Sequence, residues 1–179
     1  MTPLPSPDEC RRILREEGLH PAVVEHVEAV AAVAHRAAQA LRDRGNAVDV
    51  DLVHVGALLH DVGRSKTHGL DHATRGADLL RSRGLPEPLC LCVERHTGGG
   101  IDLAEAKALG LPPRDCTPRT LEEKLVCHID NLFDGSKRQP LAKELEYLRS
   151  QNLDRAAVKV KRLHHEISTL LGMDLDRFA

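Results

Sequence analysis

Residues 53–63 form a stretch that is aliphatic enough for the centre of a domain and yet contains His60 and Asp61. The stretch reads Val-His-Val-Gly-Ala-Leu-Leu-His-Asp-Val-Gly, and a helix that is apolar almost all round has to be covered by other elements. Burying a charged carboxylate without a partner costs several kcal/mol, so this helix also requires a cation or a hydrogen-bond network beside it. The sequence therefore predicts a central helix next to a metal ion that His60 and Asp61 help to bind.

Helix signals recur along the whole chain, whereas strand signals are poor because aromatic residues are scarce and no alternating apolar runs lie between turn pairs. Ser6 before Pro7, and Thr120 three residues before Glu123, are typical N-terminal caps, and Asp71 is expected to cap another helix. The expected helices cover residues 7–17, 21–44, 50–62, 72–83, 86–96, 102–109, 121–133, 140–150 and 154–171. This pattern predicts an all-α domain, a helical bundle of about seven to nine helices.

Composition limits the classes of function. The charges nearly balance, at 25 Lys and Arg against 27 Asp and Glu, so no general field attracts nucleic acid or an anionic membrane. Aromatic residues make up 2% of the chain, which argues against base-stacking RNA modules. No apolar stretch approaches the ~20 residues of a membrane span and no signal-peptide pattern is present, so we expect a cytoplasmic protein. The five cysteines form no Cys-x-x-Cys pair and are interpreted as reduced, packed thiols.

Helical periodicity sorts some of the eleven histidines. In the helix over 21–44, His26 lies about 60° from the centre of the apolar stripe and His35 about 120° away, so His26 is the candidate ligand and His35 faces water. His54 is also expected to face solvent. In the helix over 121–133, Asp130 and His128 both lie near the edge of the apolar arc, and spacing does not choose between them.

Adjacent residues of a helix point about 100° apart. His60 and Asp61 can therefore contact the same ion only near the end of their helix, where Gly63 lets the chain turn. Alternatively, the two oxygens of Asp61 bridge two ions.

These residues together resemble the ligand set of the HD superfamily of metal-dependent phosphohydrolases. The pattern in this sequence is His26, the pair His60-Asp61, and Asp130, and the string Leu-His-Asp-Val-Gly at 59–63 is similar to the Leu-His-Asp-Ile-Gly form of the HDIG branch. The resemblance covers about residues 20–135. It implies that these four side chains bind one ion, which favours Asp130 over His128.

The resemblance also implies a second ion. In dinuclear HD proteins, including the HD-GYP-type cyclic-dinucleotide phosphodiesterases, further histidines hold it, and the matching residues here are His72 and His96, with Asp61 bridging. The Gly-Tyr-Pro motif of that branch is absent, so its substrate is not transferred. The alternative is a single ion, with His72 and His96 binding phosphate or facing solvent.

The predicted function is hydrolysis of a phosphomonoester or phosphodiester, nucleotide-like or cyclic, by a metal-activated water, with His60 and Asp61 as catalytic residues. Histidine and carboxylate ligands suit one or two ions of Fe, Mn, Co, Ni or Zn better than calcium. Candidate cations for binding the phosphate are Arg64, Lys66, Arg75 and Lys124. Two alternatives remain: a mixed-valent di-iron oxygenase on the same ligands, and a non-catalytic module that senses a nucleotide.

Three stretches are expected along the chain. Residues 1–19 form an N-terminal helix with a flexible tail, residues 20–135 form the HD core, and residues 136–179 form a C-terminal helical extension that packs on the core. The amphipathic stripe of the last helix could instead form a homodimer interface. The expected partner is a small phosphorylated substrate rather than a membrane or a nucleic acid.

Overall fold

The computed structural model describes residues 3–178, so residues 1–2 of the predicted tail and residue 179 of the predicted extension lie outside the described residues. The part described contains nine α-helices, three short 3-10 helices and one two-stranded hairpin, which confirms the all-α prediction. The α-helices are α1 (Pro7–Glu16), α2 (Pro21–Asp43), α3 (Val50–Leu59), α4 (His72–Ser82), α5 (Glu87–Glu94), α6 (Leu103–Ala108), α7 (Leu121–Asp130), α8 (Leu141–Ser150) and α9 (Asp154–Leu171). The shorter elements are η1 (Val62–Ser65), η2 (Thr97–Gly99), β1 (Phe133–Asp134), β2 (Lys137–Arg138) and η3 (Leu175–Arg177).

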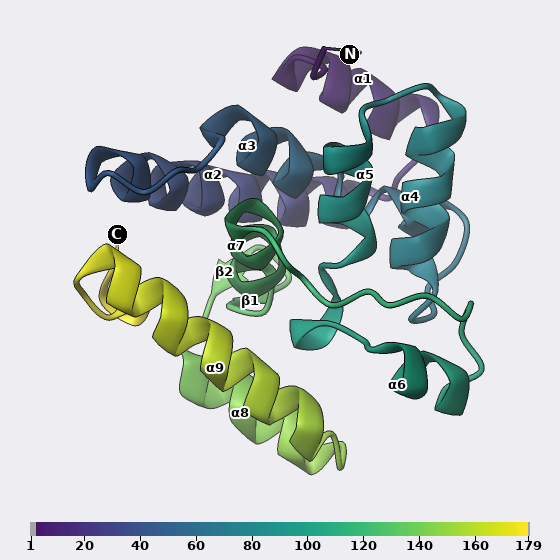
Figure 1. Ribbon diagram of the computed structural model, residues 1–179. Helices are drawn as coiled ribbons and strands as arrows, with labels where there is room; N and C mark the ends of the chain where they lie inside the picture. The colour runs from purple at the N-terminus through teal and green to yellow at the C-terminus, as the bar shows by residue number, and fades with distance from the viewer. Residues whose placement is uncertain (1–2, 179) are drawn as a thin grey trace.

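The helix α3 is the centre of the fold, as its composition predicts. Eight of its ten residues are buried, and α1, α2, α5 and α7 all pack against it. Its contact with α5 is tight, because a Cβ on Gly56 would lie 3.0 Å from the Cβ of Cys92. Figure 1 shows α4 and α5 together on one side of this centre and the pair α8 and α9 running diagonally beneath α7. The aliphatic run therefore places its C-terminal end, with His60 and Asp61, inside the molecule.

The local caps that the sequence predicts are mostly present. Ser6 with Glu9 and Thr120 with Glu123 form capping boxes at the starts of α1 and α7. The prediction for Asp71 is wrong, because its carboxylate makes no capping hydrogen bond and instead contacts Thr67 and Arg75. The physical reason is its backbone, since φ −76° and ψ −1° are helical rather than extended, and an N-cap side chain reaches the first N–H groups from an extended residue.

Three helices end two or three residues earlier than predicted. The helix α3 ends at Leu59 and α5 at Glu94, so His60 and His96 lie just beyond the last turn of their helices. The helix α7 ends at Asp130, and a hairpin of β1 and β2 follows it, with Gly135 at φ 56° in the turn. Strands of two residues are too short to show an alternating pattern, which is why sequence analysis missed them.

The last two long helices form an antiparallel pair with a small core of its own, made by Leu145, Leu148, Ala157 and Val160. The helix α9 also packs against α2, α7 and η2. The division of the chain into three stretches stays a prediction. The five cysteines are free and buried, as interpreted from the sequence. Among the helices of residues 3–178, none is long and apolar enough to cross a membrane.

Candidate metal centre

Four histidines converge with one shared orientation: His26 from α2, His72 from the start of α4, and His60 and His96 from just beyond the ends of α3 and α5. Each of His60, His72 and His96 has its Nδ1 2.7–2.8 Å from the backbone carbonyl of the residue three positions earlier. The Nδ1 of His26 lies 2.7 Å from the carbonyl of Gly135 in the hairpin turn. When Nδ1 donates its N–H to a carbonyl, the lone pair of Nε2 is free for another partner. All four Nε2 atoms point into the same small region.

The first subsite consists of His26, His60 and Asp130. The Nε2 atoms of His26 and His60 lie 3.2 Å apart, and Oδ1 of Asp130 lies 3.0 Å from the first and 3.4 Å from the second. The Oδ2 of Asp61 is 3.9 Å from both Nε2 atoms. Two imidazoles and one carboxylate thus surround one point, and Asp61 lies beside them.

The second subsite consists of His72 and His96, and it faces the other oxygen of Asp61. The two Nε2 atoms lie 3.0 Å apart, and Oδ1 of Asp61 is 3.1 Å from that of His72 and 3.7 Å from that of His96. One ligand atom each of His60, Asp61 and His96 also lie within 4.8 Å of one another, so the two subsites are contiguous. The carboxylate of Asp61 therefore lies between the two histidine pairs.

This arrangement fits divalent metal. Two imidazole lone pairs repel each other at 3.0–3.2 Å unless a proton or a cation lies near both. Nitrogen and carboxylate oxygen together form the ligand set that first-row transition ions prefer. The donors do not fix which of these ions is bound.

The electrostatics of the centre also favour positive charge. Burial opposes the charged form of His60, but the carboxylates of Asp130 and Asp61 outweigh it and raise the pKa of His60 to about 9. Burial acts against ionised Asp61 and Asp130 as well, yet the surrounding histidines, His60 foremost, hold the pKa of both carboxyls well below the usual range. Burial lowers the pKa of His96. Both carboxylates are thus ionised and ready to bind a cation.

Two glycines bring Asp61 to the second subsite. A Cβ on Gly63 of η1 would lie 2.0 Å from the carbonyl oxygen of His72 and 2.6 Å from the nitrogen of Gly76 in α4. The two backbones therefore touch, and this contact holds Asp61 beside His72. The sequence predicts Gly63 as the residue at which the helix ends and the chain turns, but no local signal marks its contact with Gly76.

Arg64 contacts the carboxylate of Asp61 directly. Its Nε lies 3.1 Å from each oxygen of Asp61, and its Nη1 donates to the carbonyl of His68 at 3.3 Å. About a third of the side chain (31%) is exposed, so the guanidinium reaches both the centre and solvent.

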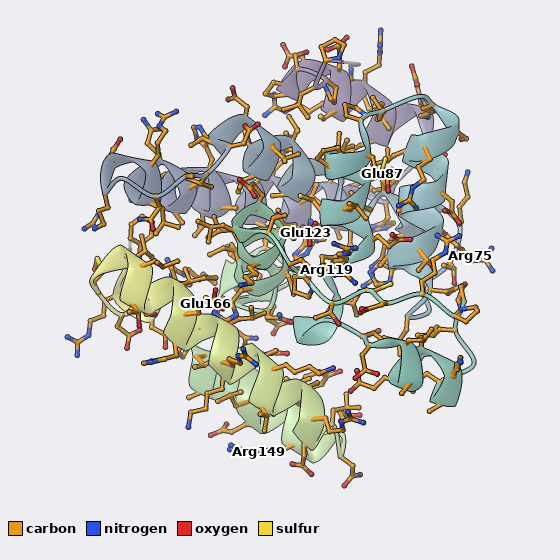
Figure 2. The ribbon with its side chains drawn as sticks, in the orientation of Figure 1. Arg75, Glu87, Arg119, Glu123, Arg149 and Glu166 are labelled. Atoms are coloured by element: carbon orange, nitrogen blue, oxygen red, sulfur yellow. The ribbon has the colours of Figure 1, made fainter. Side chains whose placement is uncertain are left out.

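The other three predicted cations have acidic partners away from the histidines. Lys66 pairs with Glu17, Arg75 with Asp71, and Lys124 with Glu166. Figure 2 shows Arg75 at the outer edge of α4 and Glu166 on α9. Their binding of a phosphate stays a prediction.

Solvent reaches the centre from the side of the first subsite. The side chains of Asp130 and His26 are 21% and 15% exposed, whereas those of His60, His72 and His96 are 3% exposed or less. Glu144 of α8 is half-buried near Asp130, and burial together with the charge of Asp130 raises the pKa of Glu144 to about 7. Glu144 cannot be identified from the sequence, because nothing in the sequence of α8 indicates its proximity to α7.

Three of the histidines that the sequence analysis considered as ligands or as solvent-facing lie outside the centre. His128 is buried and contacts His164 of α9 at 3.1 Å, so Asp130 is the residue of α7 that lies beside His26 and His60. The expectation that His35 and His54 face water is wrong, because both are half-buried. Their rings stack with centroids 4.7 Å apart.

Comparison with known families gives one match over most of the chain. The model of the HD domain matches residues 23–133, a range that contains all six histidines and aspartates of the two subsites.

Three curated relatives cover much of the chain. Two are called tRNA (cytidine(56)-2'-O)-methyltransferase: the protein of Picrophilus torridus is 42% identical over 97% of this chain, and that of Thermoplasma volcanium is 41% identical over 95%. This chain spans about half the length of both, 49% in each case. An uncharacterized protein of Methanocaldococcus jannaschii is 47% identical over 83% of this chain and 89% of its own length.

Two solved structures have a similar fold. Both are of the HD domain of the L. monocytogenes phosphodiesterase PgpH, one of them in complex with cyclic-di-AMP. The first has a TM-score of 0.53 and 19% identity and covers 93% of this chain and 97% of that chain. The second has a TM-score of 0.53 and 20% identity. At this level of identity, the likeness concerns the fold alone.

Proposed function

The chain belongs to the HD-domain family, and on that premise we propose that it is a metal-dependent phosphohydrolase acting on a phosphomonoester or a phosphodiester. The observation that carries the proposal is the position of Asp61, whose two oxygens face separate pairs of Nε2 atoms. This geometry supports two ions per chain, one that His26, His60 and Asp130 would hold and one that His72 and His96 would hold. Two such ions would supply the charge stabilisation that an in-line displacement at phosphorus uses in two-metal sites.

Bound divalent ions would supply Lewis acidity toward the phosphate oxygens and a lower pKa for water. The residues of the chain add orientation and charge. Arg64 donates from Nε to both oxygens of Asp61 and from Nη1 to the carbonyl of His68, and because its side chain is 31% exposed we propose that Nη2 donates to a phosphate oxygen. The exposed edges of Asp130 and His26 leave an approach for the substrate, while the buried His60, His72 and His96 keep the far side closed.

The lengths of the relatives indicate which part of a longer protein would carry the phosphohydrolase activity. The methyltransferase name belongs to proteins of which this chain spans about half, whereas the M. jannaschii relative is covered over 89% of its length. A similar sequence, 47% identical, thus occurs in a relative with little else attached. This supports an activity of the HD unit that is separate from methyl transfer.

The substrate we propose is a small nucleotide-like or cyclic phosphate. The PgpH structure with cyclic-di-AMP supports testing cyclic dinucleotides, and the tRNA in the relatives' name supports testing RNA as well.

The experiment uses protein loaded separately with Mn²⁺, Fe²⁺, Co²⁺, Ni²⁺ and Zn²⁺, with the metal content measured. Each form is incubated with p-nitrophenyl phosphate, bis-p-nitrophenyl phosphate, nucleotides, cyclic dinucleotides and tRNA. Asp61→Asn should lower turnover about 100-fold or more, because it removes the charge between the subsites, and His35→Ala is the matched control outside the centre. Fully loaded protein that hydrolyses nothing would overturn the proposal. Tight binding without turnover would then indicate a sensing module, and oxygen consumption by the iron form would indicate an oxygenase.

A further inference from the structure

The backbone that follows His96 has little in its own sequence to hold it in place. Gly98, Gly99 and Gly100 have φ of 56°, 78° and 98°, and glycine adopts such angles without fixing them. The hydroxyl of Thr97 is buried and has no hydrogen-bond partner among residues 3–178. The conformation of this turn therefore depends on the elements packed around it.

The helix α9 supplies one side of that packing through Lys159. Its Nζ donates to the carbonyl of Gly100 at 2.9 Å and pairs with the carboxylate of Glu105 in α6. A Cβ on Gly99 would lie 2.9 Å from the Cβ of Lys159 and 3.1 Å from the nitrogen of Val160. The turn thus lies directly against the backbone of α9, and Lys159 joins it to α6.

The helix α7 supplies the other side. The 3-10 helix η2 packs against α7, and Arg95 pairs with the buried Glu123 at 2.9 Å. Figure 2 shows Glu123 near the start of α7, beside the end of α5. Residues 95–100 are therefore held between α7 and α9, with His96 inside this stretch.

From these contacts we infer that Lys159 is a positioning residue for the second subsite. By holding the glycine turn, it keeps the Nε2 of His96 3.0 Å from that of His72 and 3.7 Å from Oδ1 of Asp61. Lys159 lies in α9, beyond the residues that the HD-domain model matches. The inference rests on the proposed metal centre and assigns part of its geometry to the C-terminal helices.

Removing the ammonium group of Lys159 should weaken the binding of the second ion and leave the binding of the first ion unchanged. Lys159→Met keeps the aliphatic stem that packs on Gly99 and removes only the ammonium group. Substitutions that loosen the support of a metal-binding histidine typically weaken metal affinity 10–100-fold, and Lys159 acts one step further away. We expect the second ion to bind about 3–10-fold more weakly. The first ion should bind as before, because His26 and His60 come from α2 and α3.

The test is a titration of metal-free protein with Co²⁺. Calorimetry measures the affinity of each ion, and the visible absorption of bound Co²⁺ is measured in the same titration. Lys159→Arg, which retains a donor and a charge, should restore most of the affinity. Lys161→Met removes an exposed lysine from the same helix and is the matched control. Thermal melting of each metal-free variant reports whether it is folded.

Loss of affinity for one ion in Lys159→Met, with rescue by arginine, supports the inference. Equal affinities in this variant and the native protein overturn it, as does equal weakening of both ions. Native protein that binds no Co²⁺ would overturn the proposed function together with the inference, so the two failures are distinguishable.

If Lys159→Met does not fold, Lys159→Gln provides the same test. Glutamine carries no charge and is shorter than lysine, so the ion pair with Glu105 is lost and the side chain no longer reaches the carbonyl of Gly100. An unchanged affinity for the second ion in that variant would overturn the inference.

Discussion

An alanine at position 63 should damage the second subsite more than its small size suggests. The new Cβ would lie 2.0 Å from the carbonyl oxygen of His72 and 2.6 Å from the nitrogen of Gly76. Carbon normally stays about 3.5 Å or more from such atoms, so η1 and α4 must separate by roughly 1 Å or more. Both obstructing atoms belong to backbone and cannot rotate away. Overpacking of this kind costs about 1–3 kcal/mol.

The same separation should move Asp61 away from His72, which it now contacts at 3.1 Å. We therefore expect Gly63→Ala to lose the second ion or to bind it at least about tenfold more weakly, in addition to its loss of stability. Urea unfolding measures the free energy of unfolding, and Co²⁺ titration measures how many ions each chain binds and how tightly.

Gly18→Ala is the control for Gly63→Ala. It strains the backbone through a positive φ but causes no steric clash. A Cβ there meets nothing within 4 Å, but φ is 68°, so the substitution should cost about 1 kcal/mol through the backbone alone and leave metal binding unchanged. The reasoning is refuted if Gly63→Ala binds two ions with native affinity.

Three further predictions concern the charges of the centre. Arg64→Met should lower kcat about tenfold, because Asp61 loses the Nε that lies 3.1 Å from both its oxygens, and Arg64→Lys should not restore the rate, since lysine lacks the planar fork; steady-state kinetics test both variants. Glu144 has a pKa of about 7 in the folded protein, raised from 4.5, so the stability it contributes is present below pH 4.5 and is lost as the pH rises through 7. Glu144→Gln should therefore stabilise the metal-free protein at pH 8 by about 1 kcal/mol, a value reduced for solvent exposure, and should change nothing at pH 4, as urea unfolding at the two values would show. Removing metal with EDTA should lower Tm by several degrees, because bound ions stabilise only the folded state; an unchanged Tm in calorimetry would contradict this expectation.

Much of the fold is predictable because its signals are local. The caps at Ser6 and Thr120 and the glycines after the helices depend on neighbours within a few residues. The position of His26 at the edge of a buried stripe also follows from helical periodicity. Where a cap depends on the backbone of its own residue, as at Asp71, sequence does not suffice.

The remaining features of the candidate site depend on contacts between distant segments. Periodicity could not choose between Asp130 and His128, because His128 is buried by His164 of α9 rather than by the central helices. Lys66 and Lys124 have acidic partners 49 and 42 residues away, which no local pattern reveals. The resemblance to a family supplied His72 and His96, and the Gly63–Gly76 contact that places them beside Asp61 is visible only in three dimensions.

The hairpin turn at Gly135 has a practical consequence for anyone who shortens this protein. Its carbonyl orients the ring of His26 from a position 109 residues later in the chain, yet the range matched to the family ends at residue 133. A gene trimmed to that range would encode all six side chains of the centre but would omit the carbonyl of Gly135, which orients the ring of His26. A minimal version of the domain should therefore extend at least through β2.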